Sequence, residues 1–282
     1  MNNTPVIKQR KKWRCAGILA ALILLLSAFD CRFKIQYYSL HTSKMSGSIR
    51  IALITDLHSC TYGKEEASLI DAVNAQSPDL VLFGGDICDD VLPNDNTESL
   101  LKGISSRYPC YYVTGNHEYW SHDINTILNL FRSYHVTILD GTFDTVEING
   151  QPVNICGITD PDVTAYTDSG YGVHDQLEAL KNAGKNNYYT ILLAHRPELI
   201  DEYAKYDFDL VLTGHAHGGQ WRIPGVLNGL YAPNQGLFPK YAGGNYEVGD
   251  LTMIVSRGLA RESTPVPRIF NRPELVILDI NR

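Results

Sequence analysis

The sequence predicts an α/β domain, because short apolar β-prone runs alternate with segments of helical periodicity along most of the chain. Five of these runs end directly in a polar motif, and functional side chains in open α/β sheets lie at the carboxyl ends of strands. About 235 of the 282 residues follow the N-terminal segment, which is enough for one domain of this class. Apolar residues make up 44% of the chain, so a sizeable buried core is expected.

The N-terminal region divides into a basic stretch at 1–14, an uncharged stretch at 15–29 and a linker at 30–48 that leads to the domain at 49–282. The uncharged stretch has 15 residues, fewer than the roughly 20 that span a bilayer and more than a minimal signal-peptide core. Trp13 and Arg14 at its border would lengthen the effective span. We therefore expect a membrane anchor, with a cleaved signal segment or a buried helix of the domain as the alternatives. The basic flank predicts a single-pass protein of the cell membrane whose domain is extracytoplasmic.

Strands are expected first at the five runs that end in polar motifs, namely 51–54, 80–83, 111–113, 191–194 and 210–212. Shorter strands follow from alternating segments at 136–140, 144–149 and 153–158, and from late apolar runs at 251–256 and 274–280. Asn149-Gly150 predicts a hairpin turn between two of them.

Helices are expected between the strands. Residues 64–76 place Leu69, Ile70 and Val73 on one helical face, and Pro78 ends the element. Further helices are expected around residues 100–104, 124–131 and 177–180, and after Pro197 at a first helical position.

Residues 221–246, called the apolar segment below, show no clear periodicity. They contain five Gly, three Pro and five aromatic residues, and they begin just after a Gly-His-Ala-His motif. An irregular stretch of this length is unusual in a compact domain. The segment is either a cover that faces a substrate or a packed surface loop.

Seven potential metal ligands lie in the five strand-end motifs. They are Asp56, His58, Asp86, Asn116, His195, His215 and His217. Oxygen and imidazole donors together suit Mn, Fe, Zn or similar divalent ions, and their number exceeds what one tetrahedral ion needs. A lone Asp after a strand is more often a turn cap and a lone His is more often a surface residue. The seven in order instead predict two divalent metal ions.

The order and spacing of these motifs resemble those of the calcineurin-like metallophosphoesterases. The motifs are Asp56-Leu57-His58, Gly85-Asp86, Gly115-Asn116-His117-Glu118, His195 and Gly214-His215-Ala216-His217. The resemblance covers about residues 49–280 and is closest to a bacterial membrane-associated branch in which the last motif continues as Gly-Gly-Gln, here Gly218-Gly219-Gln220. It implies two stacked mixed β-sheets flanked by helices, a four-layer αββα fold.

The resemblance also implies roles. Asp86 bridges the two metals, with Asp56, His58 and His217 at the first and Asn116, His195 and His215 at the second. His117 protonates the leaving group or stabilises the transition state, a role that suits an imidazole. Glu118 is expected to support the site without binding metal. The implied reaction is in-line attack of a metal-bridging hydroxide on a phosphate mono- or diester.

The membrane expectation adds an envelope or lipid phosphate as a candidate substrate, but no motif indicates the substrate-binding residues. Two other functions stay open: a dinuclear-metal hydrolase of a non-phosphate bond, and a non-catalytic surface module stabilised by metals. Gln220 is a candidate for holding the loop or touching substrate, with a purely structural residue as the alternative. Arg257 and Arg268 are expected to form surface ion pairs, with phosphate binding as the alternative.

The net charge of −7 argues against general nucleic-acid binding, which needs a basic surface. The six cysteines include no Cys-x-x-Cys pair, so a disulfide scaffold is not expected. Buried free thiols are predicted, with a Cys60–Cys88 bridge as the alternative.

Overall fold

Two six-stranded sheets stack against each other in a computed structural model that describes residues 4–261 and 266–282. The first sheet has, in spatial order, β1 (Lys34–His41), β14 (Glu274–Asn281), β2 (Ile49–Ile54), β3 (Leu80–Gly84), β4 (Cys110–Val113) and β5 (Thr137–Ile138). The second has β12 (Gly244–Val248), β13 (Leu251–Val255), β9 (Leu210–Thr213), β8 (Tyr189–Leu193), β7 (Gln151–Gly157) and β6 (Thr142–Ile148). Both sheets are mixed, since β14 runs antiparallel to β2, and β6 and β12 run antiparallel to their neighbours.

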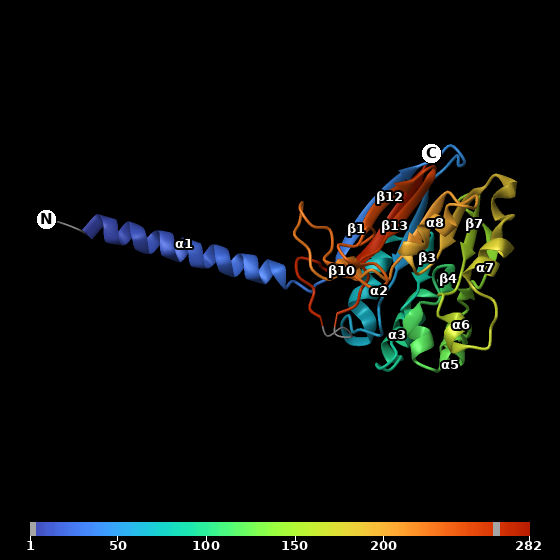
Figure 1. Cartoon of the computed structure of the whole chain (residues 1–282), viewed down its shortest axis with the longest axis horizontal. Coiled ribbons are helices and arrows are strands. Elements are labelled where there is room, and N and C mark those ends of the chain that lie inside the picture. Colours follow the sequence, from blue (N-terminus) through green and yellow to red (C-terminus); the bar gives the residue numbers. More distant parts are fainter. Residues whose placement is uncertain (1–3, 262–265) are drawn as a thin grey trace.

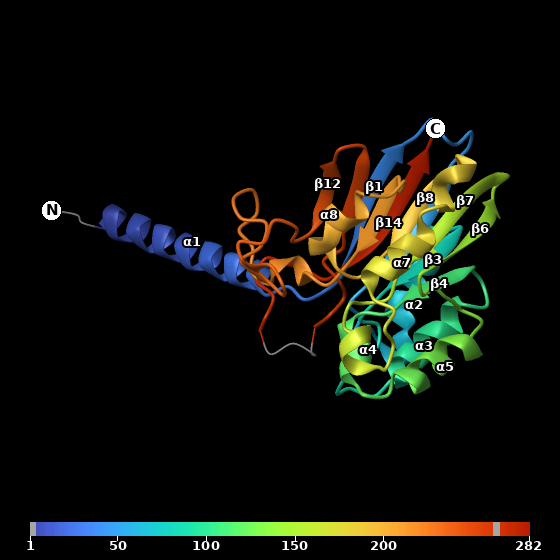
Figure 2. The same ribbon diagram turned by 45° about the vertical axis from the view of Figure 1, so that its right-hand side comes forward.

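The α-helices are α1 (Thr4–Ala28), α2 (Ala67–Gln76), α3 (Asp95–Ile104), α4 (Asn116–Trp120), α5 (Ile124–Ser133), α6 (Val163–Tyr166), α7 (Val173–Leu180) and α8 (Ile200–Tyr203). Short 3₁₀ turns lie at Lys64–Glu66, Ala183–Asn186, Pro197–Leu199 and His217–Gly219. Figures 1 and 2 show the two sheets side by side, with helices on the outer faces and α1 extending away from them. The predicted α/β class with two flanked sheets is confirmed.

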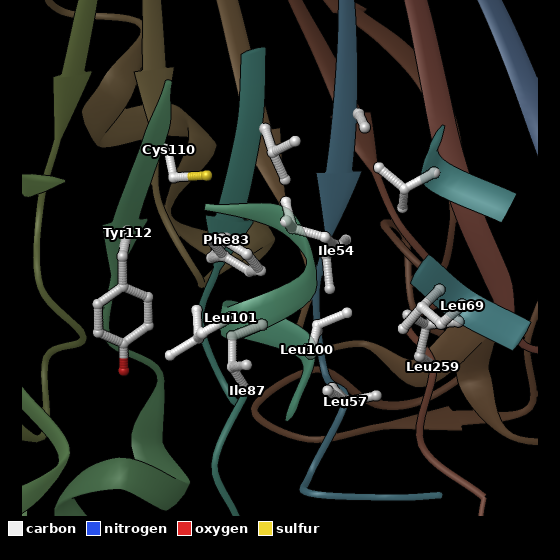
Figure 3. Close-up of a cluster of buried hydrophobic side chains, with 14 of the residues drawn as sticks. Ile54, Leu57, Leu69, Phe83, Ile87, Leu100, Leu101, Cys110, Tyr112 and Leu259 are labelled. Carbon is white, nitrogen blue, oxygen red and sulfur yellow. The ribbon is translucent and has the colours of Figure 1, made fainter. Parts of the chain in front are cut away.

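Strand alternation explains the layers. In β2, Ile51 and Leu53 point into the cluster between the sheets, whereas Ala52 and Ile54 point into the cluster under the helices. A third cluster lies between the second sheet and α7 and α8. Figure 3 shows part of the cluster beneath α3, where Leu100 and Leu101 lie near Ile54 and Phe83 of neighbouring strands.

Parallel pairing places the functional ends together. The strands β2, β3 and β4 are parallel neighbours in the first sheet, and β8 and β9 are parallel neighbours in the second. The carboxyl ends of parallel strands lie at one edge of a sheet, so the loops that follow these strands share that edge.

The range 30–48, expected as a linker, contains the edge strand β1. Its eight residues pair in parallel with the whole of β14, from Lys34 opposite Glu274 to His41 opposite Asn281. The strand is only half-buried and its sequence KIQYYSLH mixes polar with apolar residues, so its pattern was weak. Its pairing partner lies about 240 residues later in the chain, which no local pattern can indicate.

The expected membrane anchor at 15–29 requires correction. Across residues 4–261 and 266–282, no helix combines the length and the apolar character needed to cross a membrane. The uncharged part of α1 covers residues 15–28, or about 21 Å at about 1.5 Å per residue, against a hydrocarbon core of about 30 Å. The single-pass location and the outward orientation derived from that anchor are therefore withdrawn.

The apolar segment is more ordered than its composition suggested. It holds a short hairpin of β10 (Tyr231–Ala232) and β11 (Gly236–Leu237), and it ends in β12 at the edge of the second sheet. Several of its large side chains face solvent, including Tyr231, Leu237 and Phe238. In Figure 1 its orange loops lie beside the C-terminal end of α1.

Candidate metal centre

The loops after five strands bring the seven predicted ligands together. Asp56 and His58 follow β2, Asp86 follows β3, and Asn116 begins α4 directly after β4. His195 follows β8, and His215 and His217 follow β9. All seven are buried, although they are polar or charged. A buried group of this kind requires compensation by hydrogen bonds, ion pairs or metal ions.

Each of the seven side chains has one buried nitrogen or oxygen atom without a hydrogen-bond partner. These atoms are Asp56 Oδ2, His58 Nε2, Asp86 Oδ2, Asn116 Oδ1, His195 Nε2, His215 Nδ1 and His217 Nδ1. Leaving a buried polar atom unpaired costs about 1–3 kcal/mol. Among them, Asp86 Oδ2 and His195 Nε2 face each other at 3.1 Å. The set fits metal coordination, because a cation would supply the partner that these atoms lack.

Asp86 links two groups of potential ligands. Atoms of Asp56, His58, Asp86 and His217 lie within 4.8 Å of one another, and so do atoms of Asp86, His195 and His215. Asp86 is the member that both groups share, which is the position that a bridging carboxylate needs.

Backbone strain accompanies these side chains. Five of the seven ligands have positive φ angles: Asp56 (48°), His58 (50°), Asp86 (52°), His215 (63°) and His217 (46°). The left-handed region costs about 1–2 kcal/mol for a residue with a side chain. Strain of this kind is typical of functional sites, where it aims side chains that a regular strand would leave pointing elsewhere.

The second nitrogen of three ligand imidazoles is bonded within the protein. His58 Nδ1 lies 3.2 Å from Asp89 Oδ2, His195 Nδ1 lies 2.9 Å from the Gly84 carbonyl, and His215 Nε2 lies 2.9 Å from Asn234 Oδ1. Such partners select the tautomer and orient the ring, so that the opposite nitrogen faces the centre. Asp89 and Asn234 were not identified from the sequence.

His117 lies at the border of this cluster and stays partly exposed. Its Nδ1 is 2.7 Å from Asp90 Oδ1 and 3.8 Å from Asp89 Oδ2, and its ring meets the His58 ring edge to face. Its backbone N–H donates to Asp86 Oδ1 at 2.9 Å. The contact with Asp90 leaves Nε2 of His117 as the nitrogen that is free to serve the site.

Glu118 ties two of the strand ends together. Its buried carboxylate accepts hydrogen bonds from the backbone N–H groups of Asp86, Ile87, Cys88 and Gly115, at 2.7–3.0 Å. Burial and the neighbouring Asp86 raise the pKa of Glu118 to about 7, while the backbone donors oppose this rise. The side chain holds the Asp86 loop against the start of α4 and has no unpaired atom facing the centre.

The ionisable ligands interact strongly without metal. Burial opposes the charged form of His195, but the carboxylate of Asp86 outweighs it and raises the pKa of His195 to about 10. The pKa of Asp86 is correspondingly well below its usual range, because the charges of the surrounding imidazoles overcome the effect of burial. Burial and nearby positive charges lower the pKa of both His215 and His217.

The two arginines named in the sequence are not at the surface. Arg257 donates to Asn228 and to the carbonyl of Gly243, which braces the apolar segment. Arg268 is buried, with Nε bonded to the Ala260 carbonyl and both terminal nitrogens without a partner. Surface ion pairing was therefore the wrong expectation for both, because both side chains are buried in the domain.

A further buried arginine connects the centre with the apolar segment. Arg196 forms a paired contact with Asp160 at 2.5 and 2.8 Å, and its Nη1 donates to Asn234 Oδ1 at 2.6 Å. The same oxygen of Asn234 faces His215, so the apolar segment contributes directly to the surroundings of a ligand. Arg196 follows His195 in the sequence and Asn234 follows Pro233, but no sequence motif identifies either residue as part of the site.

The cysteines, Gln220 and the histidines outside the five motifs are the other residues of interest. The cysteines are thiols, and Cys60 and Cys88 are buried in the core beneath α3. Gln220 follows the last ligand motif with a positive φ of 57°, and its Oε1 is buried without a partner. A third group of neighbouring potential ligands in the described part of the chain is formed by His58, Asp89 and His117. His41, His122, His135 and His174 belong to none of the three groups found there.

Comparisons with known proteins agree with this geometry. Residues 49–219 match the family of calcineurin-like phosphoesterases. An uncharacterized metallophosphoesterase of Aquifex aeolicus is 31% identical over 271 residues, which cover 93% of this chain and 97% of that protein. One of Campylobacter jejuni is 31% identical over 93% of this chain and 68% of that protein.

Among solved structures, the NAD nucleotidase of Haemophilus influenzae shares the fold, with a TM-score of 0.54 and 16% identity. The match covers 76% of this chain, which spans 46% of that longer protein.

Proposed function

The chain belongs to the calcineurin-like phosphoesterase family, and from this premise we propose that its seven-ligand centre holds two divalent cations and hydrolyses phosphate mono- or diesters. Membership of the family makes the protein a metal-dependent phosphoesterase. The number of ions, the ligand assignment and the type of ester are proposed from the geometry of this chain.

One observation carries the proposal: every predicted ligand has one buried, unpaired donor atom, and Asp86 belongs to both groups of neighbouring ligands. Asp56, His58 and His217 would complete one cation site around Asp86. Asn116, His195 and His215 would complete the other. Carboxylate, amide and imidazole donors suit Mn, Fe or Zn.

Two bound cations would supply positive charge for the phosphate oxygens and would lower the pKa of water at the centre. The residues of the chain do the positioning. Glu118 fixes the Asp86 loop through four backbone hydrogen bonds, and Asp89 holds the His58 ring.

His117 is proposed as the residue that acts on the leaving group. The contact of Nδ1 of His117 with Asp90 fixes the ring and leaves Nε2 as the nitrogen that would exchange a proton with the ester oxygen. The side chain is partly exposed, as a group that must meet substrate has to be.

Within the phosphoesters we favour a substrate with an apolar part, such as a lipid phosphate. The support is the exposed aromatic and aliphatic side chains of the apolar segment, which starts four residues after His217.

The test uses purified full-length protein and a generic aryl phosphate, assayed with and without added Mn²⁺ and after chelation. Metal-dependent release of the aryl alcohol, together with about two ions per chain by metal analysis, is the expected result. Full metal loading without hydrolysis of aryl mono- or diesters would favour a metal-stabilised, non-catalytic module. Hydrolysis of amide substrates alone would favour the non-phosphate hydrolase.

A further inference from the structure

An apolar pocket of about 300 Å³ lies in the loops that follow the last metal motif. Its lining includes Gly219, Gln220, Trp221, Leu230, Tyr231 and Pro233. This volume is at the lower end of the roughly 300–1,000 Å³ range of small-molecule sites. The pocket is therefore large enough for part of a substrate.

The pocket lining adjoins the metal centre at two places along the chain. Gly219 and Gln220 lie two and three residues after His217, and the backbone N–H of Gln220 donates to the His217 carbonyl at 3.2 Å. At the other place, Pro233 precedes Asn234, whose Oδ1 lies 2.9 Å from His215. His217 is thus two residues before the pocket lining in the sequence, and His215 contacts the residue that follows Pro233 of the lining.

The walls of the pocket are held in place by the fold. Trp221 Nε1 donates to the Pro267 carbonyl at 3.0 Å, and the Leu230 N–H donates to the carbonyls of Gly219 and Trp221 at 2.9 Å. Gly219 has a φ of 65°, and a side chain there would collide with the backbone of Gly229. The pocket is therefore preformed, which reduces the entropy lost on binding.

The chemistry of the lining selects an uncharged, apolar ligand. None of the described lining residues carries a charge. The aromatic rings of Trp221 and Tyr231 are accessible to a ligand, since 41% and 52% of the surface of these residues is exposed. Leu237 and Phe238 of the same segment are both 66% exposed, so the apolar surface continues beyond the pocket. Contiguous exposed apolar surface of this kind typically marks a binding site.

The described lining of this pocket has no cationic side chain that could bind a phosphate group. The neighbouring metal centre has the donor atoms for two cations, which could bind it. The two sites are complementary to the two ends of an amphipathic phosphoester. We propose that the pocket binds the hydrocarbon chain of such a substrate while its phosphate lies at the metal centre. This inference rests on the proposed phosphoesterase function and adds the class of substrate.

The test measures binding without turnover. The full-length protein with Mn²⁺ is titrated calorimetrically with methylphosphonate and with octylphosphonate, both below the concentration at which micelles form. Burying about three methylenes of the longer chain would favour octylphosphonate by roughly 30-fold or more in Kd. Leu230→Ser, Trp221→Ser and the more exposed Tyr231→Ser should each reduce this ratio by about 5-fold or more, with the affinity for methylphosphonate unchanged.

Val226→Ser is the matched control, because Val226 lies in the same segment and is 83% exposed but does not line the pocket. Its chain-length ratio should equal that of the wild type. Equal affinity of the wild-type protein for both phosphonates would overturn the inference. The same holds if the three pocket variants keep the wild-type ratio, or if Val226→Ser lowers it as much as they do.

A hydrolysis assay separates this inference from the proposed function. The rates of p-nitrophenyl methyl phosphate and p-nitrophenyl octyl phosphate are compared in the same proteins. A preference for octylphosphonate that depends on Leu230 and Trp221, without hydrolysis of any ester, would support the pocket and reject the phosphoesterase. Hydrolysis of both esters without a chain-length preference would support the phosphoesterase and reject the pocket.

Discussion

The metal centre and the apolar segment lie side by side but are built on opposite physical principles. The centre gathers buried polar atoms at strained backbone positions, and cations would satisfy them. The apolar segment exposes aromatic and aliphatic side chains and is held by ordinary backbone hydrogen bonds. Asn234 is the point where the two regions meet.

The difference teaches where single substitutions should act. At the centre each donor has one geometric role, so its loss removes chemistry or metal. In the apolar segment each side chain contributes a share of a non-directional contact, so its loss should change selectivity more than the chemical step.

The largest effect is expected from Asp86→Asn. Asp86 is shared by both ligand groups, and an amide lacks the charge needed to bridge two cations. Activity should fall on the order of 10³-fold or more, together with the metal content measured by mass spectrometry. Asp144→Asn is the control, since Asp144 bonds the Tyr111 hydroxyl on a strand away from the centre. Normal metal content and activity in Asp86→Asn would reject the bridging role.

His117→Gln should separate chemistry from metal binding. The side chain contacts Asp90, and His117 is not one of the seven residues whose buried donor atoms lack a hydrogen-bond partner. We expect kcat to fall about 10²- to 10⁴-fold, with about two ions per chain retained. Loss of metal in this variant would show that His117 is a ligand, contrary to its assigned role.

Glu118→Gln should weaken the frame of the centre. The carboxylate accepts four backbone N–H groups, and one end of an amide cannot accept them. The expected loss in the free energy of unfolding is about 2–3 kcal/mol, measured by denaturant titration of the metal-free protein. Glu98→Gln, at an exposed helical position, should leave it unchanged within about 0.5 kcal/mol.

Metal binding should release protons near neutral pH. The pKa of His195 is about 10 in the metal-free protein and that of His58 is also raised, yet imidazole binds metal only when neutral. Metal affinity should therefore increase with pH, by up to about tenfold per pH unit for each proton displaced. Calorimetry in buffers of different ionisation enthalpy measures this release, and a pH-independent affinity between pH 6 and 8 would contradict it.

The same shift sets the pH dependence of the metal-free fold. A raised pKa means that the charged His195 contributes stability that is fully present below its ordinary value of 6.5. This contribution is lost as the pH rises toward about 10. Saturating metal should remove the dependence, because the imidazole is then neutral at every pH in that range.

The smallest effect is expected from deletion of residues 1–26. The side chains of α1 from residue 12 to 27 are exposed. The C-terminal end of α1 is bonded to the domain at Ala28, whose carbonyl accepts a hydrogen bond from the Phe270 N–H at 2.7 Å. Aryl phosphate hydrolysis and the melting temperature should stay within experimental error. Deletion of residues 1–41 is the contrasting variant, because it also removes β1 and all eight of its pairings with β14. An equal melting temperature for the two deletions would mean that β1 does not stabilise the sheet.

Much of the centre could be predicted because it is local. Each ligand motif follows its own apolar strand within a few residues, so position and strand direction together predict where the side chains meet. The family assignment rested on the same five motifs and is confirmed. The supporting residues were harder to find. Asp89 and Asp90 carried a usable signal, three and four residues after Asp86, whereas Asn234 reaches His215 from a loop without periodicity.

The sequence by itself determined the α/β class, the order of the strands that carry ligands and the family, because these depend on periodicity and spacing along the chain. Only the tertiary structure decided which donors remain unpaired, that β1 joins the first sheet, and that the apolar segment forms a pocket next to His217. It also overturned the membrane anchor expected at 15–29. The physical reason is common to the tertiary features: burial, strand pairing and cavity shape arise from contacts between residues tens to hundreds of positions apart, and no local pattern contains them.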